Sequence, residues 1–161
     1  MPPACLCILP ARFGVHEATA ATNAYVRTPE ADSAVVAQRG RGEAEALVAA
    51  LRSAGVDALA LDERDRGVDP CPDAVFPNNW FVVHDRTLVL CPMLNELRRR
   101  ERWGGFRAHL EGAGVAIDRV IDMACHERDG LALEGTGSLV FDRAQRAVYA
   151  ARSARTDEGL A

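Results

Sequence analysis

Two adjacent asparagines, Asn78 and Asn79, stand where an apolar segment runs into a predicted strand, and Asp73 lies shortly before them. Asparagine at such a place is usually a turn residue whose amide bonds to the local backbone. If the strand is buried, however, both amide groups lose water and need new partners. Either the protein or a ligand supplies them, so the residues leave turn chemistry and substrate contact both open.

A second polar segment, LEGTGS at residues 133–138, leads into another predicted strand in the same way. Its carboxylate, Glu134, is suited to hold a cation or a group that carries several N–H donors. The plain alternative is a loop carboxylate before a glycine turn. If the two lead-ins belong to repeats arranged in a ring, they converge on one central cavity, and Glu134 then lies near Asn79.

Two arginines have residue environments that suit a carboxylate ligand. Arg155 lies in the segment SART, at the start of a predicted helix, and Arg98 lies at the start of another. An arginine fixed in this way can bind a substrate carboxylate through two parallel hydrogen bonds. The alternatives are a helix N-cap with a surface arginine for Arg155, and a solvated helix face for Arg98. His126 has no nucleophile beside it, so a surface or capping role is favoured.

The cysteines do not form a recognisable site. Their number is odd, and no two are separated by the two residues of a CxxC pair, which argues against zinc. We interpret all of them as reduced, mostly buried small apolar residues of a cytoplasmic protein. None has the setting of an activated nucleophile. No metal and no cofactor is expected. The five cysteines are Cys5, Cys7, Cys71, Cys91 and Cys125.

Alternating apolar residues place both lead-ins before β-hairpins. The first hairpin pairs Trp80–His84 with Thr87–Leu90 across a turn at Asp85 and Arg86, and the second pairs Ser138–Phe141 with Arg146–Ala151. Phe81 and Leu139 take equivalent places in the two hairpins, which indicates a repeat. Three further strands are predicted, at Cys5–Leu9, Val56–Leu61 and Val115–Ile121. One helix is predicted from Pro29 to Ala54, with a kink at Gly40 and Gly42. Another is predicted over Asn95–Gly112, with a break at Gly104-Gly105.

The elements therefore predict an α/β protein built from ββαβ repeats, in which strand–helix–strand at the N-terminus is part of a third copy. Thr156–Ala161 is expected to begin a helix that would be too short to be stable alone. We expect residues 1–161 to form a single domain that lacks its C-terminal part, as the front of a longer protein or a truncated relative.

Bulk composition excludes several classes of function. The 161 residues are 48% hydrophobic and 26% charged with a net charge of −4, which fits one globular domain and gives no electrostatic footprint for nucleic acid. No apolar run reaches the roughly 18 residues that span a bilayer. The N-terminus lacks the basic region of a signal peptide. We therefore expect a cytoplasmic location and no nucleic-acid or membrane partner.

The order of four motifs resembles a known group of enzymes. PDAVFPNNW, then PM followed by RRxER, then LEGTGS, then SxRTxEG, with a looser match at PARFG near the start, resembles the guanidino-group-modifying superfamily. That superfamily includes arginine deiminase, dimethylarginine dimethylaminohydrolase and the amidinotransferases. Within it, PNNW and LEGTGS most resemble the citrulline-utilisation hydrolases, also described as amidinotransferase-like. The resemblance covers essentially the whole chain.

The resemblance implies a pentein-type α/β propeller, here an incomplete ring of roughly half its repeats. It also implies metal-free covalent catalysis, in which a cysteine thiolate attacks the guanidinium or ureido carbon and a histidine transfers protons. By the same resemblance Asp73 and Asn79 contact the substrate nitrogens, with Asn78 beside them, and Glu134 orients the histidine and the substrate. Arg155 and Arg98 then bind the carboxylate of an amino-acid substrate.

Two departures from the superfamily pattern shape the functional hypothesis. Deiminases have an aspartate where this chain has Asn79, and an amide suits a neutral ureido group, which favours citrulline over free arginine. The superfamily's histidine and nucleophilic cysteine lie in its C-terminal half, so the chain alone is expected to be inactive.

The leading hypothesis is the front part of a C–N hydrolase that converts citrulline to ornithine. The alternatives are a non-catalytic remnant that binds amino acids or self-associates as an incomplete ring, and part of a dimethylarginine or arginine hydrolase or of an amidinotransferase.

Overall fold

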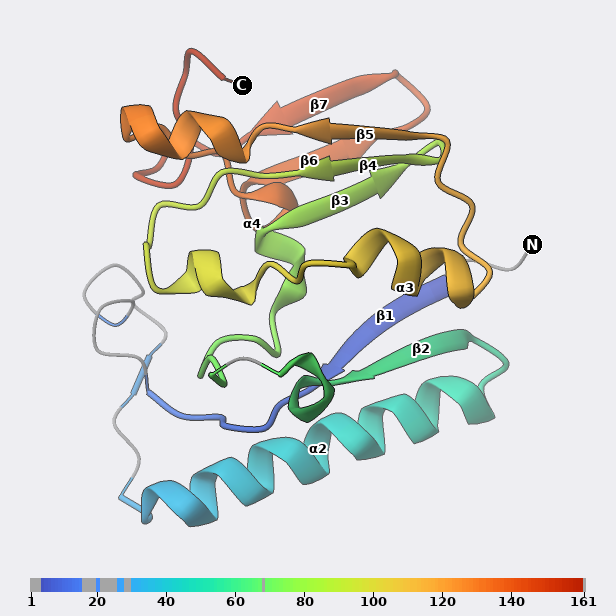
Figure 1. The fold of residues 1–161 in the computed structure, drawn as a ribbon, viewed down its shortest axis with the longest axis vertical. Helices are drawn as coiled ribbons and strands as arrows, with labels where there is room; N and C mark the ends of the chain where they lie inside the picture. The colour runs from blue at the N-terminus through green and yellow to red at the C-terminus, as the bar shows by residue number, and fades with distance from the viewer. Residues whose placement is uncertain (1–3, 16–19, 21–25, 28–29, 68, 161) are drawn as a thin grey trace. The chain divides into compact units, whose positions relative to one another are not determined.

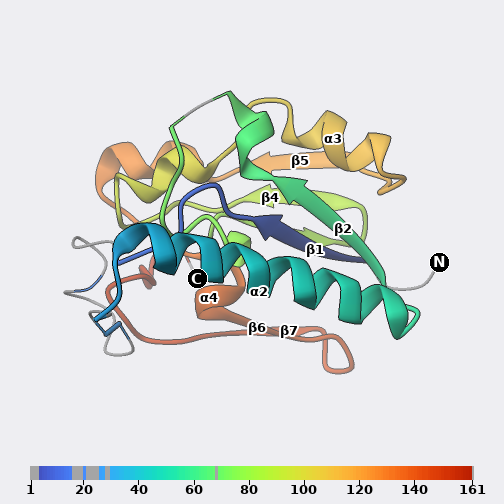
Figure 2. The same cartoon turned by 90° about the horizontal axis from the view of Figure 1, so that it is seen from below.

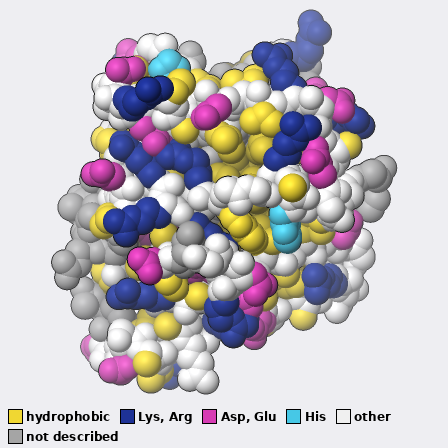
Figure 3. Space-filling model, viewed as in Figure 1, with side chains coloured by type: hydrophobic (Ala, Val, Ile, Leu, Met, Phe, Trp, Pro, Cys, Tyr) yellow, Lys and Arg dark blue, Asp and Glu magenta, His cyan; other side chains and the backbone are white. Residues whose placement is uncertain are grey.

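The computed structural model describes residues 4–15, 20, 26–27, 30–67 and 69–160. The chain divides into two compact units, Met1–Pro77 and Asn78–Ala161. Among the described residues, no helix has the length and hydropathy needed to cross a membrane. The face of the molecule in Figure 3 carries arginine and acidic side chains interspersed with one another, so neither sign of charge dominates that face.

The first unit is a strand–helix–strand arrangement. Strands β1 (Ala4–Leu9) and β2 (Asp57–Asp62) pair in parallel, and helix α2 (Ser33–Ser53) makes the connection that a parallel pair requires (Figure 1). Figure 2 shows α2 running along the two strands. Asp32 caps the start of α2 by accepting a hydrogen bond from the Ala34 amide at 2.8 Å. Gly55 follows its end with a φ of 79°, as the sequence predicts.

Helix α2 has no break at its two glycines, so the predicted kink is wrong. A Cβ atom on Gly40 would lie 2.4 Å from the ring of Phe13. The glycine is thus explained by close packing against that ring rather than by bending of the helix. The predicted first helical residue, Pro29, lies outside the described residues, and the described helix begins at Ser33.

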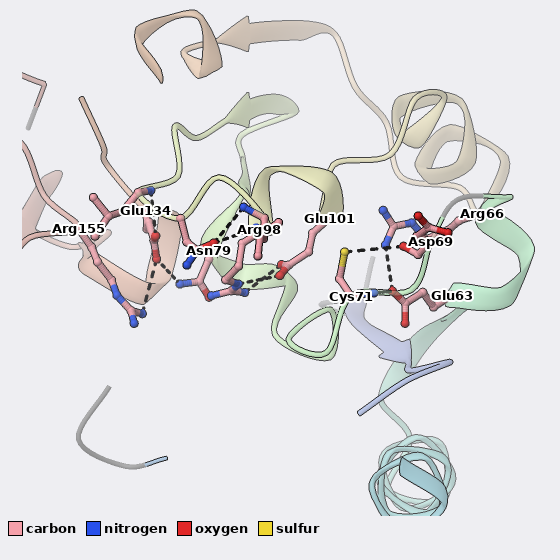
Figure 4. A network of polar contacts seen from close by, with 12 residues as sticks. Glu63, Arg66, Asp69, Cys71, Asn79, Arg98, Glu101, Glu134 and Arg155 are labelled. Atoms are coloured by element: carbon pink, nitrogen blue, oxygen red, sulfur yellow. Dashed lines mark hydrogen bonds and ion pairs between the residues drawn. The ribbon is translucent and has the colours of Figure 1, made fainter. Parts of the chain in front are cut away.

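A buried carboxylate closes the carboxyl end of this small sheet. The 3-10 helix η1 (Glu63–Arg66) follows β2 within the segment that the sequence predicts as a loop. Glu63 is 1% exposed and accepts hydrogen bonds from the backbone amides of Ala11 at 2.9 Å and Cys71 at 2.6 Å (Figure 4). It therefore joins the segment after β1 to the segment that leads to Asp73.

The second unit contains one complete ββαβ repeat. Strands β3 (Phe81–His84) and β4 (Thr87–Leu90) form the predicted hairpin, and β5 (Arg119–Asp122) lies parallel to β4 at the edge. The short helices η3 (Arg98–Glu101) and α3 (Phe106–Gly112) make the connection. Phe106 packs with Trp80 and Phe81, and the three ring centroids lie 4.6 Å from one another.

The predicted helix over Asn95–Gly112 is divided at the glycine pair, because Gly105 has a φ of 88°. The predicted strand Val115–Ile121 begins later, at Arg119. The Val115 amide closes the end of α3 by bonding to the carbonyl of Leu110 at 2.9 Å, so it cannot also join a strand.

A second hairpin follows without a further strand beside it in the described residues. Helices η4 (Ala124–Asp129) and α4 (Gly135–Ser138) precede the antiparallel strands β6 (Leu139–Asp142) and β7 (Ala147–Ala150). The facing residues Val140 and Tyr149 are 67% and 58% exposed, whereas Val82 of the first hairpin is 9% exposed. The predicted equivalence of the two hairpins is confirmed, but only the first has its apolar side chains covered.

The helix predicted to begin at Thr156 is wrong for the described residues. Thr156 forms an antiparallel bridge with Leu133, and the Asp157 amide donates a hydrogen bond of 2.6 Å to the carbonyl of Ala132. This pairing holds the backbone extended where the sequence predicts the first helical turn, and only turns follow it.

Candidate functional site

Both predicted lead-ins are short helical turns placed directly before a strand. The 3-10 helix η2 (Pro77–Asn79) precedes β3, and α4 precedes β6. The two segments approach closely, because a Cβ atom on Gly135 would lie only 2.5 Å from the carbonyl oxygen of Asn78. A Cβ atom on Gly137 would lie 2.6 Å from Nδ2 of Asn79. The glycines of LEGTGS are thus explained by this contact.

A buried hydrogen bond joins the two lead-ins. Nδ2 of Asn79 donates to Oε2 of Glu134 over 2.6 Å, and the two residues are 5% and 2% exposed (Figure 4). The prediction that the lead-ins converge is confirmed for this pair. Because the amide nitrogen must face the carboxylate, the carbonyl oxygen of Asn79 faces away from it and can accept a further hydrogen bond.

The segment around Arg155 completes one side of this cluster. Its carbonyl oxygen accepts the backbone N–H of Glu134 at 3.1 Å, and its guanidinium Nη1 lies 3.6 Å from Oε2 of the same carboxylate. The side chain of Arg155 is 25% exposed, whereas that of Glu134 is 2% exposed. The arginine therefore offsets the buried negative charge, and part of its side chain stays open to solvent.

The segment Cys91–Leu94 lies against the other oxygen of Glu134. The Leu94 amide donates to Oε1 over 3.3 Å, and the Leu133 amide donates to the carbonyl of Pro92 over 3.0 Å. Each carboxylate oxygen of Glu134 thus has at least one protein donor. An ionised carboxylate has about four acceptor positions, so capacity remains for the N–H groups of a ligand.

Arg98 is placed differently from Arg155. It is buried and forms two hydrogen bonds to Glu101, from Nε at 2.7 Å and from Nη2 at 2.9 Å (Figure 4). This geometry matches the predicted bidentate binding of a carboxylate, but the carboxylate belongs to the protein. A role of Arg98 in binding a substrate stays a prediction.

The remaining predicted residues lie in varied positions. Asn78 is exposed, and its backbone rather than its side chain meets α4. Asp73 belongs to the first unit, where it is half-buried in a turn that the Phe76 amide closes by donating to its carbonyl at 3.0 Å. His126 is half-buried within η4. The substrate contacts assigned to Asp73 and Asn78 stay predictions.

Sequence reasoning missed two residues close to this cluster, Arg102 and Glu127. Their side chains form a bidentate pair with both N···O distances at 2.5 Å, and Glu127 also accepts the Met93 amide at 2.8 Å. Each lies in a mixed-charge run that is typical of an exposed helix face. No local pattern distinguishes them, because the contact depends on how residues far apart in sequence are brought together.

Two of the cysteines, Cys91 and Cys7, have environments that do not favour a thiolate. All five are free thiols. Burial raises the pKa of Cys91 to about 11, although its neighbour Arg102 opposes the shift. Partial burial and the neighbouring Cys5 raise the pKa of Cys7. Within the described ranges, no three His, Cys, Asp or Glu side chains gather as a metal site.

Solved structures similar to this chain share its fold. An AgrE complex with ornithine and NAD+ has a TM-score of 0.67 at 20% identity, over 98% of this chain and 21% of its own. A citrulline complex of a dimethylarginine dimethylaminohydrolase mutant from Pseudomonas aeruginosa has a TM-score of 0.62 at 18% identity, over 98% of this chain and 53% of its own. ArgZ, a cyanobacterial arginine dihydrolase, has a TM-score of 0.59 at 17% identity, over 97% of this chain and 21% of its own.

The chain spans about half the length of the dimethylarginine dimethylaminohydrolase structures that it matches. No curated protein sequence matches it. The family model described as "N,N dimethylarginine dimethylhydrolase, eukaryotic" matches residues 9–161, which is nearly the whole chain. The mixed α/β fold, the four sequence motifs and this match agree. The chain therefore belongs to the N,N-dimethylarginine dimethylhydrolase family, within the guanidino-group-modifying pentein superfamily.

Proposed function

We propose that these 161 residues form the substrate-holding part of a hydrolase that cleaves a C–N bond in a ureido or guanidino amino acid, with citrulline favoured. The observation that carries this proposal is the cluster of Asn79, Glu134 and Arg155, of which the first two are buried. It combines a fixed carboxylate, an amide and a partly exposed arginine at the meeting point of two equivalent lead-ins.

The charge balance of the cluster supports a neutral ureido group. Arg155 lies 3.6 Å from the carboxylate of Glu134, so one positive charge already offsets the negative one. A cationic guanidinium would gain less there than beside an uncompensated carboxylate. Asn79 uses one of its two N–H donors on Glu134, and its carbonyl oxygen is the group proposed to accept a ligand N–H. That acceptor alone does not distinguish citrulline from arginine, and the preference rests on charge.

The nucleophile and the general base are proposed to lie outside these residues, as the superfamily resemblance implies. A nucleophilic cysteine needs a depressed pKa or an adjacent base. Cys91 has the opposite property, with a pKa of about 11. Cys125 is exposed, and its thiol contacts a backbone carbonyl at 3.6 Å. We therefore propose that the chain alone has no hydrolase activity.

The finer architecture belongs to the same proposal. We propose a single pentein domain in which the ββαβ repeat and the second hairpin are members of an incomplete α/β propeller. The antiparallel pairing of β6 with β7, which repeats that of β3 with β4, supports this arrangement. The five free cysteines support the proposed cytoplasmic location.

Two alternatives each have a specific observation in their favour. The exposed Val140 and Tyr149 on the second hairpin favour a non-catalytic amino-acid-binding protein that associates with a second copy. The name of the matching family model favours hydrolysis of dimethylarginine, with arginine hydrolysis or amidino transfer as related activities.

The test combines turnover and binding on the 161-residue chain. Citrulline, arginine and dimethylarginine are each supplied, and ornithine, citrulline and dimethylamine are measured by mass spectrometry. We expect no turnover. In amide NMR spectra we expect citrulline to shift the resonances of Asn79 and Glu134 more than arginine does. Glu134→Gln should weaken that response, and Glu111→Gln, at an exposed ion pair, should not.

Two results would contradict the proposal. Turnover that a Cys71 or Cys125 substitution abolishes would contradict the absence of the nucleophile. Resonances that none of the three amino acids shifts would contradict a substrate-holding role. The coding DNA after Ala161 separates the first alternative from the proposal. An open frame with a later histidine and cysteine supports the hydrolase, and a stop codon supports the binding protein.

A further inference from the structure

Glu127 holds the backbone of the segment that reaches Glu134. Its side chain is 10% exposed, and its Oε1 accepts the backbone amide of Met93 at 2.8 Å. The same carboxylate binds both terminal nitrogens of Arg102 at 2.5 Å and lies 3.5 Å from Nε of Arg99. A carboxylate that receives a backbone donor and a bidentate guanidinium together has little freedom to rotate.

The two arginines bind carbonyl oxygens of the same segment. Nη1 of Arg102 donates to the carbonyl of Cys91 at 3.2 Å, and Nε of Arg99 donates to that of Met93 at 3.0 Å. Met93 itself is 0% exposed. Three backbone groups of the segment Cys91–Leu94 are therefore held by side chains. Glu127 accepts the amide of Met93, and the two arginines donate to the carbonyls of Cys91 and Met93.

The next amide along the chain is the one that contacts the site. The Leu94 N–H donates to Oε1 of Glu134 at 3.3 Å, near the upper limit of a useful hydrogen bond. A small displacement of the segment would remove this contact. Without it, Oε1 of Glu134 loses the Leu94 donor, and only the contacts of Oε2 with Asn79 and Arg155 then restrict rotation of the carboxylate about the last side-chain bond.

We infer that Glu127 is a positioning residue for Glu134. Paired with Arg102, it fixes Met93 so that the Leu94 N–H points at Oε1 of the site carboxylate. As far as ligand binding is concerned, this inference rests on the proposed function. The positioning of Leu94 is a property of the chain itself and can be measured without a ligand.

The first test is amide hydrogen exchange in the 161-residue chain. Glu127→Gln removes the charge that holds Arg102, and Glu111→Gln removes the exposed partner of Arg107 as a matched control. We expect exchange of the Leu94 amide to rise by about tenfold or more in Glu127→Gln, because the variant loses the hold that keeps this amide bonded to the charged Glu134. The β4 amides should keep their wild-type rates, and the control should leave Leu94 unchanged.

A second variant guards against loss of folding. Arg102→Lys keeps the charge but cannot form the bidentate contact, and it should give a smaller rise at Leu94 with β4 unchanged. An unchanged Leu94 rate in Glu127→Gln would overturn the inference. A rise shared equally by β4, or unfolding of both variants, would also overturn it, because either would show a purely structural role.

Ligand binding supplies the second readout. Glu127→Gln should weaken the NMR response of Glu134 to citrulline while the melting temperature stays near that of Glu111→Gln. A citrulline affinity equal to wild type would contradict transmission of the effect to the ligand. If wild type itself binds no amino acid, the proposed function fails, and the exchange experiment still decides whether Glu127 positions Leu94.

Discussion

Replacing Gly135 with alanine tests the contact between the two lead-ins directly. The added Cβ would lie 2.5 Å from the carbonyl oxygen of Asn78, 3.2 Å from that of Phe81 and 3.2 Å from Cγ2 of Val82. Two of these atoms belong to the backbone, so they cannot rotate away. Since ordinary contact begins at 3.4 Å, α4 and the end of η2 must separate by most of an ångström.

The energetic cost of that separation has two parts. Overpacking a tight contact costs about 1–3 kcal/mol, and weakening the Asn79–Glu134 hydrogen bond costs about 1.5–3 kcal/mol. Alanine regains up to about 1 kcal/mol through its higher helix propensity. The net loss should be about 1.5–6 kcal/mol, which is a large part of the stability of a small domain.

Urea denaturation measures this loss, and Gly112→Ala is the matched control. Gly112 also lies in a short helix, α3, but a Cβ there meets nothing within 4 Å. With an m-value of about 2 kcal/mol/M, Gly135→Ala should lower the urea midpoint by about 0.8–3 M, and Gly112→Ala should leave it equal or raise it. A Gly135→Ala midpoint equal to that of wild type would refute the reasoning, because the close approach could then not be real.

Three further predictions concern stability. Phe106→Ala should cost about 3–5 kcal/mol in urea denaturation because its buried ring packs on Trp80 and Phe81, whereas Val140→Ala, at an exposed position, should cost under about 0.5 kcal/mol. Similar losses would contradict the burial pattern. Arg64 and Arg41 depress the pKa of Asp62, so Asp62→Asn should lower the free energy of unfolding by about 1 kcal/mol at neutral pH, after allowance for solvent exposure. This difference should begin to shrink as pH falls below about 4 and disappear only at much lower pH, and a difference that stays constant in acid would contradict it. Burial raises the pKa of Cys91 to about 11 from 9.0. The free energy of unfolding of wild type should therefore fall by up to about 3 kcal/mol relative to that of Cys91→Ala as pH rises between these two values, and parallel pH profiles of the two proteins would contradict this.

The parts of the fold that the sequence predicts well are those with strong local signals. The alternation around Phe81 and Leu139 predicts both hairpins, and the pair Gly104-Gly105 predicts the break before α3. The errors occur where a distant partner decides the local structure. Thr156 is extended because Leu133 pairs with it, although its own sequence favours a helix start. The start of β5 is likewise set by its register on β4.

The site shows the same division. The repeat places Asn79 and Glu134 in two equivalent lead-ins, so the meeting of these lead-ins could be predicted. The pairing of Arg98 with Glu101 could not, because an arginine that binds a substrate carboxylate and one that binds a protein carboxylate have the same sequence signature. Glu127 had no signal at all, since its importance comes from the backbone amide that it accepts.

The hydrogen bond between Asn79 and Glu134 also has a consequence for the order of folding. Its partners are 55 residues apart, whereas the strands of each hairpin are joined by short turns. Contacts that close short loops form early, and those that close long loops form late. We therefore expect the first hairpin to fold with the Asn79 amide still hydrated. Loss of Glu134 should then speed unfolding and leave the folding rate nearly unchanged.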